Sequence, residues 1–219
     1  MSEPTRGLRL IVLAALLLGI IAALGAGAAP DNSGGGLKVA TLDTTRVLSE
    51  YKGTVASNNQ LRKMADDYQL TFQTWKQNPL LSEADQKRMS DLVLKGANAT
   101  EAEKAELKKL QDQSSALYSE FVNLQTKGGA ALTEADKARI TALTKLAGDT
   151  DSRIQFRSKE ADDQFRKIQG DNLNRILKEV REGVAKVAKK GGYNLVLSNE
   201  MAWYAENDIT EDVLKELNK

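Results

Sequence analysis

The sequence predicts a mainly α-helical protein with a small β part. Of its 219 residues, 28% are charged, only 5% are aromatic and three are proline, which is a composition typical of long helices. Apolar residues recur every three or four positions along most of the chain. Short apolar runs at 37–42 and 193–197 flank this helical region and are typical of strands. We therefore expect a long, coiled-coil-like helical-hairpin arm on a small body of strands and helix.

The composition excludes several classes of function. Lys and Arg number 31 against 30 Asp and Glu, so the formal net charge is +1 and gives no bulk attraction for nucleic acid. The chain has neither His nor Cys, and therefore no imidazole base, thiolate nucleophile, disulfide or cysteine zinc site. It also has no phosphate-binding loop. We expect a protein that is not an enzyme and has no cofactor, no metal site and no nucleic-acid partner.

The N-terminal segment predicts export from the cytoplasm. Two arginines precede an uncharged apolar run over 10–29. Ala26 and Ala28 match the small-residue pattern of a signal cleavage site, so we expect 1–28 to be a signal peptide. The alternative is an uncleaved membrane anchor, because about twenty apolar residues can span a bilayer. The Gly-rich residues 29–36 are expected to form a flexible spacer.

The helical arm is expected over 44–190. At about 1.5 Å per residue, helix 45–77 is about 50 Å long, helix 100–127 about 42 Å and helix 133–190 about 87 Å. The first two lengths together nearly equal the third. We therefore expect an outgoing limb built from 45–77 and 100–127, with a helix at 82–95 folded back or across between them, and a returning limb at 133–190. The extra helices fall within 79–133.

Helix-start signals support these boundaries. Asp43, Thr44 or Thr45 can cap the first helix, and Pro79 ends it because the residue before a proline avoids the helical region. Ser82, Thr100 and Thr133 are each followed three residues later by Asp or Glu, as in a capping box. All three starts open copies of an internal repeat, of which the copy at Thr100 is the weakest. The repeat could be a duplicated helix start or a calcium-binding loop. A duplicated helix start is the simpler interpretation, because the acidic residues lack the spacing of a calcium loop.

The β-containing body is expected to comprise 37–43 and 191–219. Besides the two strands named above, 201–205 is expected to form a strand and 208–219 a short helix. Three such strands bury too little surface to be stable alone, and their exposed edges favour pairing. We therefore expect the body to oligomerise. The residues expected to form it are Val39, Leu42, Leu195, Leu197, Ile209, Val213 and Leu214.

Short sequence strings at the two ends of the helical region carry a family resemblance. They are Lys-Val-Ala-Thr-Leu-Asp at 38–43, Val-Ala-Lys-Val-Ala at 184–188, Tyr-Asn-Leu-Val-Leu at 193–197 and Asp-Ile-Thr-Glu-Asp-Val-Leu-Lys at 208–215. Together with the order of the elements, they resemble the Skp/OmpH family of periplasmic chaperones. The resemblance covers about a third of the chain in sequence and nearly all of it in layout.

The resemblance implies a periplasmic homotrimer whose β bodies carry three helical arms. It implies an ATP-independent holdase that binds unfolded outer-membrane β-barrel proteins in the cavity between the arms and prevents their aggregation. The alternative is a membrane-anchored coiled-coil spacer or envelope adaptor, held in the inner membrane and facing the periplasm.

Tyr68, Phe72 and Trp75 form an aromatic stripe at helical spacing. Under the resemblance, the stripe is a candidate client contact on the cavity wall. Packing against the returning helix is the simpler interpretation, because aromatic residues at this spacing usually fill a core.

The chain departs from the family pattern in two respects. Without 1–28 its charge is balanced, whereas many members are strongly basic. The segment 79–133 also makes the arm longer and more broken than a simple hairpin, and could widen the cavity or serve a different client. Lys186, Lys189 and Lys190 are candidate contacts for an anionic membrane surface or client. Their placement at a helix C-terminus is explained more simply by the helix dipole.

Overall fold

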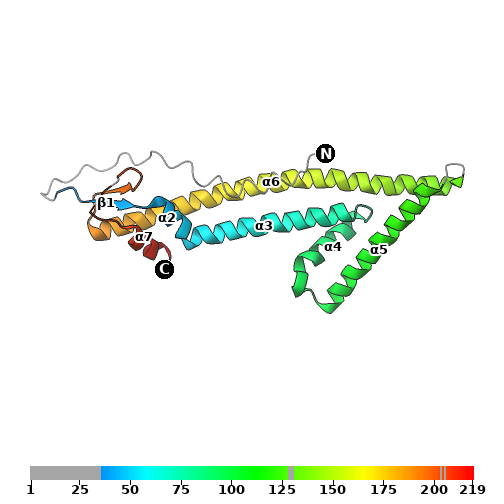
Figure 1. Cartoon of the computed structure of the whole chain (residues 1–219), viewed down its shortest axis with the longest axis horizontal. Helices are drawn as coiled ribbons and strands as arrows, with labels where there is room; N and C mark the ends of the chain where they lie inside the picture. Colours follow the sequence, from blue (N-terminus) through cyan, green and yellow to red (C-terminus); the bar gives the residue numbers. More distant parts are fainter. Residues whose placement is uncertain (1–35, 128–130, 203, 205) are drawn as a thin grey trace. The chain divides into compact units, whose positions relative to one another are not determined.

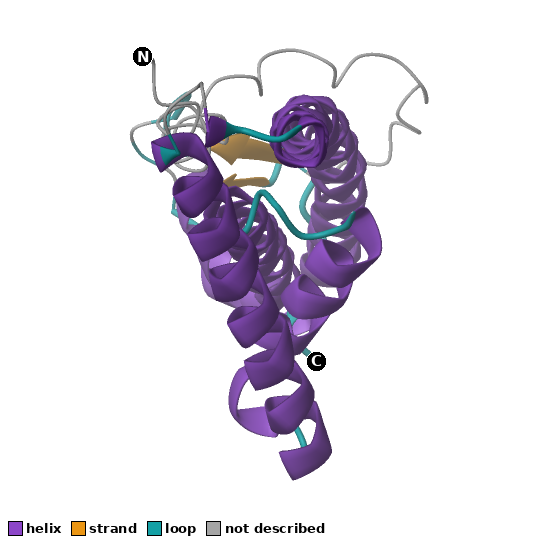
Figure 2. Ribbon diagram, turned by 90° about the vertical axis from the view of Figure 1, so that its right-hand side faces the viewer, coloured by secondary structure: helices purple, strands orange, loops and turns teal. Residues whose placement is uncertain are grey.

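The computed structural model describes residues 36–127, 131–202, 204 and 206–219, and most of them are helical (Figures 1 and 2). The predicted fold class, mainly α with a small β part, is confirmed. In chain order the elements are β1 (Val39–Leu42), α2 (Thr44–Glu50), α3 (Lys52–Gln77), α4 (Glu83–Lys95), the 3-10 turn η1 (Gly96–Asn98), α5 (Glu101–Thr126), α6 (Glu134–Gly191), β2 (Leu195–Ser198) and α7 (Thr210–Leu217).

The chain divides into two compact units, which are described separately. Of the described residues, unit 1 comprises those up to Arg62 and those from Lys167 onward, and unit 2 comprises those within Lys63–Arg166. Among the described residues, no helix is both long and apolar enough to cross a membrane. The apolar run 10–29, with the expected cleavage residues Ala26 and Ala28, lies outside the described residues.

The three predicted helix starts are confirmed by their capping hydrogen bonds. The Asp85 backbone N–H donates to Ser82 Oγ over 3.2 Å. Thr100 forms a complete capping box, in which its hydroxyl accepts from the Glu103 N–H and its own N–H donates to the Glu103 carboxylate. Thr133 makes the same reciprocal pair with Asp136. These bonds satisfy N–H groups that the first helical turn leaves unpaired.

The predicted helix 45–77 is interrupted at Tyr51, where ψ of 121° takes the backbone out of the helical region. Asn218, near the C-terminus, bridges the break. Its Oδ1 accepts from the Lys52 N–H over 2.8 Å, and its Nδ2 donates to the Glu50 carbonyl over 3.3 Å. A Cβ on Gly53 would lie 2.5 Å from the Tyr51 ring, so a larger residue there would require the Tyr51 side chain to move.

In unit 1, the two strands are parallel, with Val39 opposite Leu195 and Thr41 opposite Leu197. One face of the sheet packs on helices α2, α6 and α7. The buried core residues are Ala40, Leu42, Val47, Ile209, Val213 and Leu214, and the residues packed against them include Val180, Val184, Val187 and Leu217.

The predicted strand at 201–205 does not appear among the residues described there. The N–H groups of Met201 and Ala202 both donate to the Ser198 carbonyl, so the chain turns immediately after β2. The edge of β1 that does not pair with β2 instead bonds to the segment 207–209. Thr41 donates to the Asn207 carbonyl over 2.8 Å and accepts from the Ile209 N–H over 3.0 Å.

In unit 2, α4 and α5 form a branch. The Arg88 guanidinium of α4 pairs with the Glu106 carboxylate of α5, over a core of Leu81, Met89, Leu92 and Leu110. The second half of α5 packs instead on α6, through Leu124, Leu143 and the Arg139–Glu120 pair. Of α5, only this second half therefore lies along α6 as expected for the outgoing limb. The first half diverges from α6 together with α4 (Figure 1).

We predict that Asn218→Ala destabilises the protein by about 1 kcal/mol, the typical effect of losing a helix N-cap. The N–H of Lys52 and the carbonyl of Glu50 lose their side-chain partner. Thermal unfolding followed by circular dichroism measures the change, and hydrogen exchange should accelerate at the first amides of α3. Lys219→Ala is the control, because it removes only an exposed ion pair with Glu216 and should change stability by under about 0.5 kcal/mol. Equal effects of the two variants would contradict the bridging role.

Candidate functional site

The predicted oligomerisation residues lie on two sides of the sheet in unit 1. Leu42, Ile209, Val213 and Leu214 are at most 5% exposed and belong to the unit's own core. Strand alternation places Val39, Leu195 and Leu197 on the opposite face, where Leu195 is 38% exposed. Further exposed apolar side chains follow or precede the strands, namely Leu37, Met201 and Tyr204. Oligomerisation stays a prediction. The residues that remain candidates for contact with another copy are those of this outer face.

The aromatic stripe lies in unit 2 and is partly buried. Tyr68 and Phe72 stack with ring centroids 5.9 Å apart, and Phe72 meets Trp75 edge-on at 6.0 Å. Trp75 is 9% exposed, and its indole N–H donates to the Gln86 carbonyl. Tyr68 and Phe72 are half-buried, and the Tyr68 hydroxyl donates to Gln164 over 2.7 Å. Contact with a client stays a prediction for all three residues.

A buried polar cluster joins α4 to α6 and to the turn that follows α3. Gln86 is 1% exposed and Thr150 is fully buried. The Gln86 amide nitrogen donates to the Asn78 carbonyl and to Thr150 Oγ1, and Thr150 in turn donates to the Pro79 carbonyl over 3.0 Å. Arg153 completes the cluster, because its guanidinium donates to Gln86 Oε1 over 2.8 Å. We call these bonds the Gln86 cluster.

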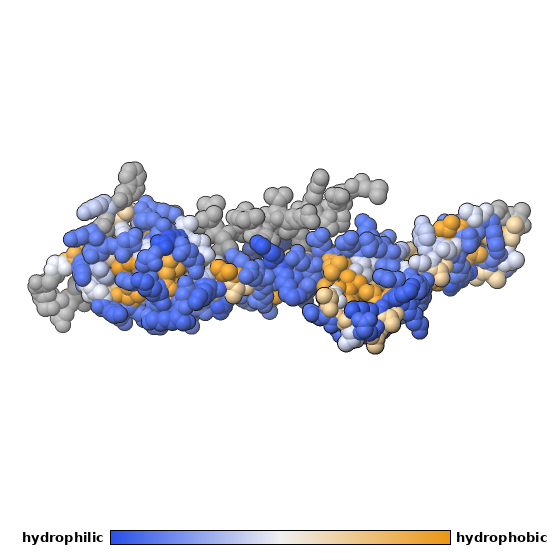
Figure 3. Space-filling view, turned by 60° about the horizontal axis from the view of Figure 1, so that its bottom comes forward, coloured by the Kyte–Doolittle hydropathy of each residue, from blue (hydrophilic) through white to orange (hydrophobic). Residues whose placement is uncertain are grey.

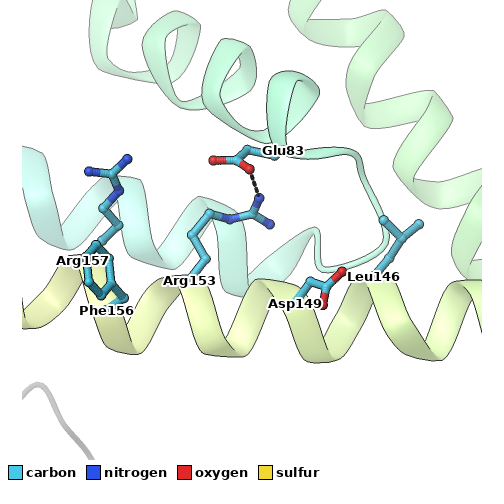
Figure 4. Close-up of a pocket in the computed structure, with 6 residues that line it drawn as sticks. All are labelled: Glu83, Leu146, Asp149, Arg153, Phe156 and Arg157. Carbon is cyan, nitrogen blue, oxygen red and sulfur yellow. Dashed lines mark ion pairs between the residues drawn. The ribbon is translucent and has the colours of Figure 1, made fainter.

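Arg153 also forms part of a surface pocket of about 400 Å³ (Figure 4). From α6 it reaches Glu83 at the start of α4 over 3.1 Å, and its guanidinium lies 5.6 Å from the centre of the Trp75 ring. Phe156, which is 61% exposed, also lines the pocket. Two arginines and two carboxylates line it, so it has no net charge to select an ionic ligand.

Carboxylates at the helix contacts of unit 2 are held in their charged form. The Lys95 ammonium lowers the pKa of Glu103 to about 2. The guanidinium groups of Arg88 and Arg139 lower the pKa values of Glu106 and Glu120, respectively. These groups fasten one helix to another, and within the described residues no cluster of three or more potential ligands could hold a metal ion.

Comparison with known proteins identifies the family of this chain. The family model described as "Outer membrane protein (OmpH-like)" matches residues 38–217. That match runs from the start of β1 to the end of α7. The chain belongs to the OmpH-like family. It is also 32% identical over 100 residues to "Chaperone protein Skp" of Yersinia enterocolitica, over 43% of this chain and 61% of that relative. No solved structure matches.

Within this OmpH-like chain, sequence reasoning missed the Gln86 cluster. Gln86 and Thr150 lie in polar helical stretches, and Arg153 resembles any other solvated arginine. One signal in the sequence could have indicated it. Gln86 lies four residues after the Ser82 cap, which places it one turn into a helix that must pack on its neighbours.

The three lysines Lys186, Lys189 and Lys190 lie in the last turns of α6, and Lys186 reaches Glu216 at 3.8 Å.

Replacing Gln86 by leucine removes the amide but keeps the side-chain size. We predict a loss of at least about 2 kcal/mol, because each buried polar group left unpaired costs about 1–3 kcal/mol. Urea unfolding followed by circular dichroism measures the loss. Lys87→Leu, at the exposed neighbouring position, should change stability by no more than about 0.5 kcal/mol. A Gln86→Leu protein as stable as the parent would show that the cluster does not hold the helices together.

Acid should loosen the branch. Because the folded-state pKa of Glu103 is below its ordinary 4.5, its stabilisation is complete above about pH 4.5 and is lost as pH falls toward 2. The pKa values of Glu106 and Glu120 shift in the same direction. Melting temperature should therefore be level from pH 7 to 5 and fall below pH 4.5. Glu103→Gln should flatten part of this fall. Glu101→Gln, at a side chain 89% exposed, should leave the acid limb unchanged, and a parallel fall in all three proteins would contradict the assignment.

Proposed function

We propose that this protein is an ATP-independent periplasmic chaperone, a holdase that keeps unfolded outer-membrane β-barrel proteins from aggregating. The family match over 38–217 carries the proposal. The similarity to a chaperone over 100 residues supports it. The absence of His and Cys from the sequence favours a binding protein over an enzyme.

The active form in this proposal is a homotrimer joined through the body of unit 1. The partly exposed residues Val39, Leu195 and Leu197 support this assembly, because a short two-stranded sheet is marginal alone and its uncovered apolar face is stabilised by burial. The helical regions then act as arms around a cavity that holds the client.

Holding without ATP requires many weak contacts, so that the client can leave without an energy input. Exposed apolar side chains are distributed in unit 2 over different helices, as Leu94, Tyr118, Val122 and Phe156. Figure 3 shows apolar side chains gathered over the α4–α5 branch and separated from other apolar areas by hydrophilic surface. Substitution of one such side chain should therefore reduce holding slightly rather than abolish it.

The N-terminal segment supports a periplasmic location for this function, through the signal-like run 10–29. The same run supports a second candidate, in which it remains as an inner-membrane anchor and the protein is a coiled-coil spacer or envelope adaptor. The N-terminal residue of the protein isolated from its own cells separates the two. A start near Ala29 indicates a cleaved signal.

The holdase proposal is tested by diluting an unfolded outer-membrane barrel protein from urea, with and without residues 31–219, while light scattering is recorded. We expect aggregation to be suppressed and the effect to saturate near three chains per client. Circular dichroism confirms that the chaperone is folded. Aggregation that proceeds unchanged beside a folded protein would contradict the holdase and favour the spacer.

A further inference from the structure

Charge is distributed very unevenly along α5. Seven of the twelve residues in 101–112 are charged, whereas Glu120 is the one charged residue in 113–126. Glu120 is already paired, because Arg139 donates two hydrogen bonds of 2.7 Å to its carboxylate. The second half of α5 therefore presents a surface almost without net charge, whereas the first half of the same helix is densely charged.

This uncharged half of α5 borders a groove. The groove has a volume of about 390 Å³ and lies between the turn at 77–80 and one face of α5. Leu80, on its floor, is 4% exposed, whereas Tyr118 on its rim is 62% exposed. None of its lining residues is charged: Gln77, Asn78, Pro79, Leu80, Ser114, Ser115, Tyr118 and Ser119.

The rim carries hydroxyl groups that are open to a ligand. Ser115 and Ser119 are exposed, whereas Ser114 is only 9% exposed. Val122, one helical turn beyond Tyr118 and 38% exposed, extends the same face. An exposed tyrosine and valine among serine hydroxyls form one continuous uncharged stripe on α5.

Such a surface suits one class of ligand. Tyrosine supplies a large rigid contact at low entropic cost, and serine and asparagine supply adaptable hydrogen bonds. A charged peptide would lose hydration here without gaining an opposite charge. Strands of outer-membrane barrels alternate apolar with polar residues and carry aromatic girdles, so unfolded segments of this type match the groove in polarity. The volume also falls in the range of small ligand pockets.

We propose that the groove between 77–80 and α5 is a client-binding site for extended, uncharged segments that carry aromatic residues. The inference rests on the proposed holdase function and assigns the extra helices of 79–133 to client contact. The groove accepts one aromatic side chain and the backbone next to it. Tyr118 packs on that ring while the serine hydroxyls bond the backbone.

The first test places a photo-reactive benzoyl-phenylalanine at Tyr118 in the full chain. The probe is a synthetic peptide that alternates Val or Tyr with Ser or Thr and has no charged side chain. Asn123 is the matched control position, because it is exposed and uncharged and lies about 140° around the helix from Tyr118. We expect cross-links to the peptide from position 118 and few from position 123.

The second test measures peptide affinity by fluorescence anisotropy. Ser115→Glu puts a charge into the groove and should weaken binding about two- to fivefold, or about 0.4–1 kcal/mol. Tyr118→Ala should have an effect of similar size, and Asn123→Glu should have none. All three positions are exposed, and circular dichroism confirms that each variant is folded.

The outcomes separate this inference from the proposed function. If the parent protein suppresses aggregation but both positions cross-link equally, or if Ser115→Glu binds like the parent, the groove is not the client site and the holdase stands. Cross-links from Tyr118 to a second copy of this chain would make the groove a self-association surface and overturn the inference. If the parent does not suppress aggregation, the proposed function itself is wrong.

Discussion

The architecture of unit 2 depends on one buried polar side chain, Gln86. Its amide bonds the Asn78 carbonyl and Thr150, and its carbonyl side accepts from Arg153. A buried amide is costly unless all its partners are in place, so this glutamine fits only when α4 begins directly after the turn at 78–81. The direction in which the α4–α5 branch leaves follows from that requirement, because apolar contacts alone allow helices to slide and rotate.

Unit 1 joins two parts of the chain that are distant in sequence. Parallel pairing of β1 with β2 requires a long connection, and the helices between them provide it. The C-terminal residues then close the unit. Thr41 bonds on one edge to the 207–209 segment, and Asn218 bridges the break between α2 and α3. The N- and C-terminal sequence strings thus depend on each other for their stability.

Local sequence signals predicted most of the fold because local chemistry determines it. Ser82, Thr100 and Thr133 start helices where their side chains can cap, and Pro79 ends one where helix cannot continue. The break at Tyr51 was not predictable in this way, since the apolar spacing continues through it to Val55. The residue that bridges it, Asn218, lies 167 positions further along the chain. The strand predicted at 201–205 is wrong for a similar reason. The chain turns back after β2, where Met201 and Ala202 bond to the Ser198 carbonyl, and it is residues 207–209 that bond to the edge of β1.

The site was predictable to a smaller extent, because contact surfaces are made by side chains whose neighbours come from other helices. The aromatic stripe was visible in the sequence, but the burial of Trp75 depends on Gln86 and Arg153. Charge asymmetry within α5 is equally visible, yet it has meaning only beside the turn at 77–80 that completes the groove. The nearly balanced net charge of +1 is compatible with the proposed binding of clients by uncharged contacts. Dense charge on much of the surface favours solubility, and the groove proposed as a client site is a place where charge is absent.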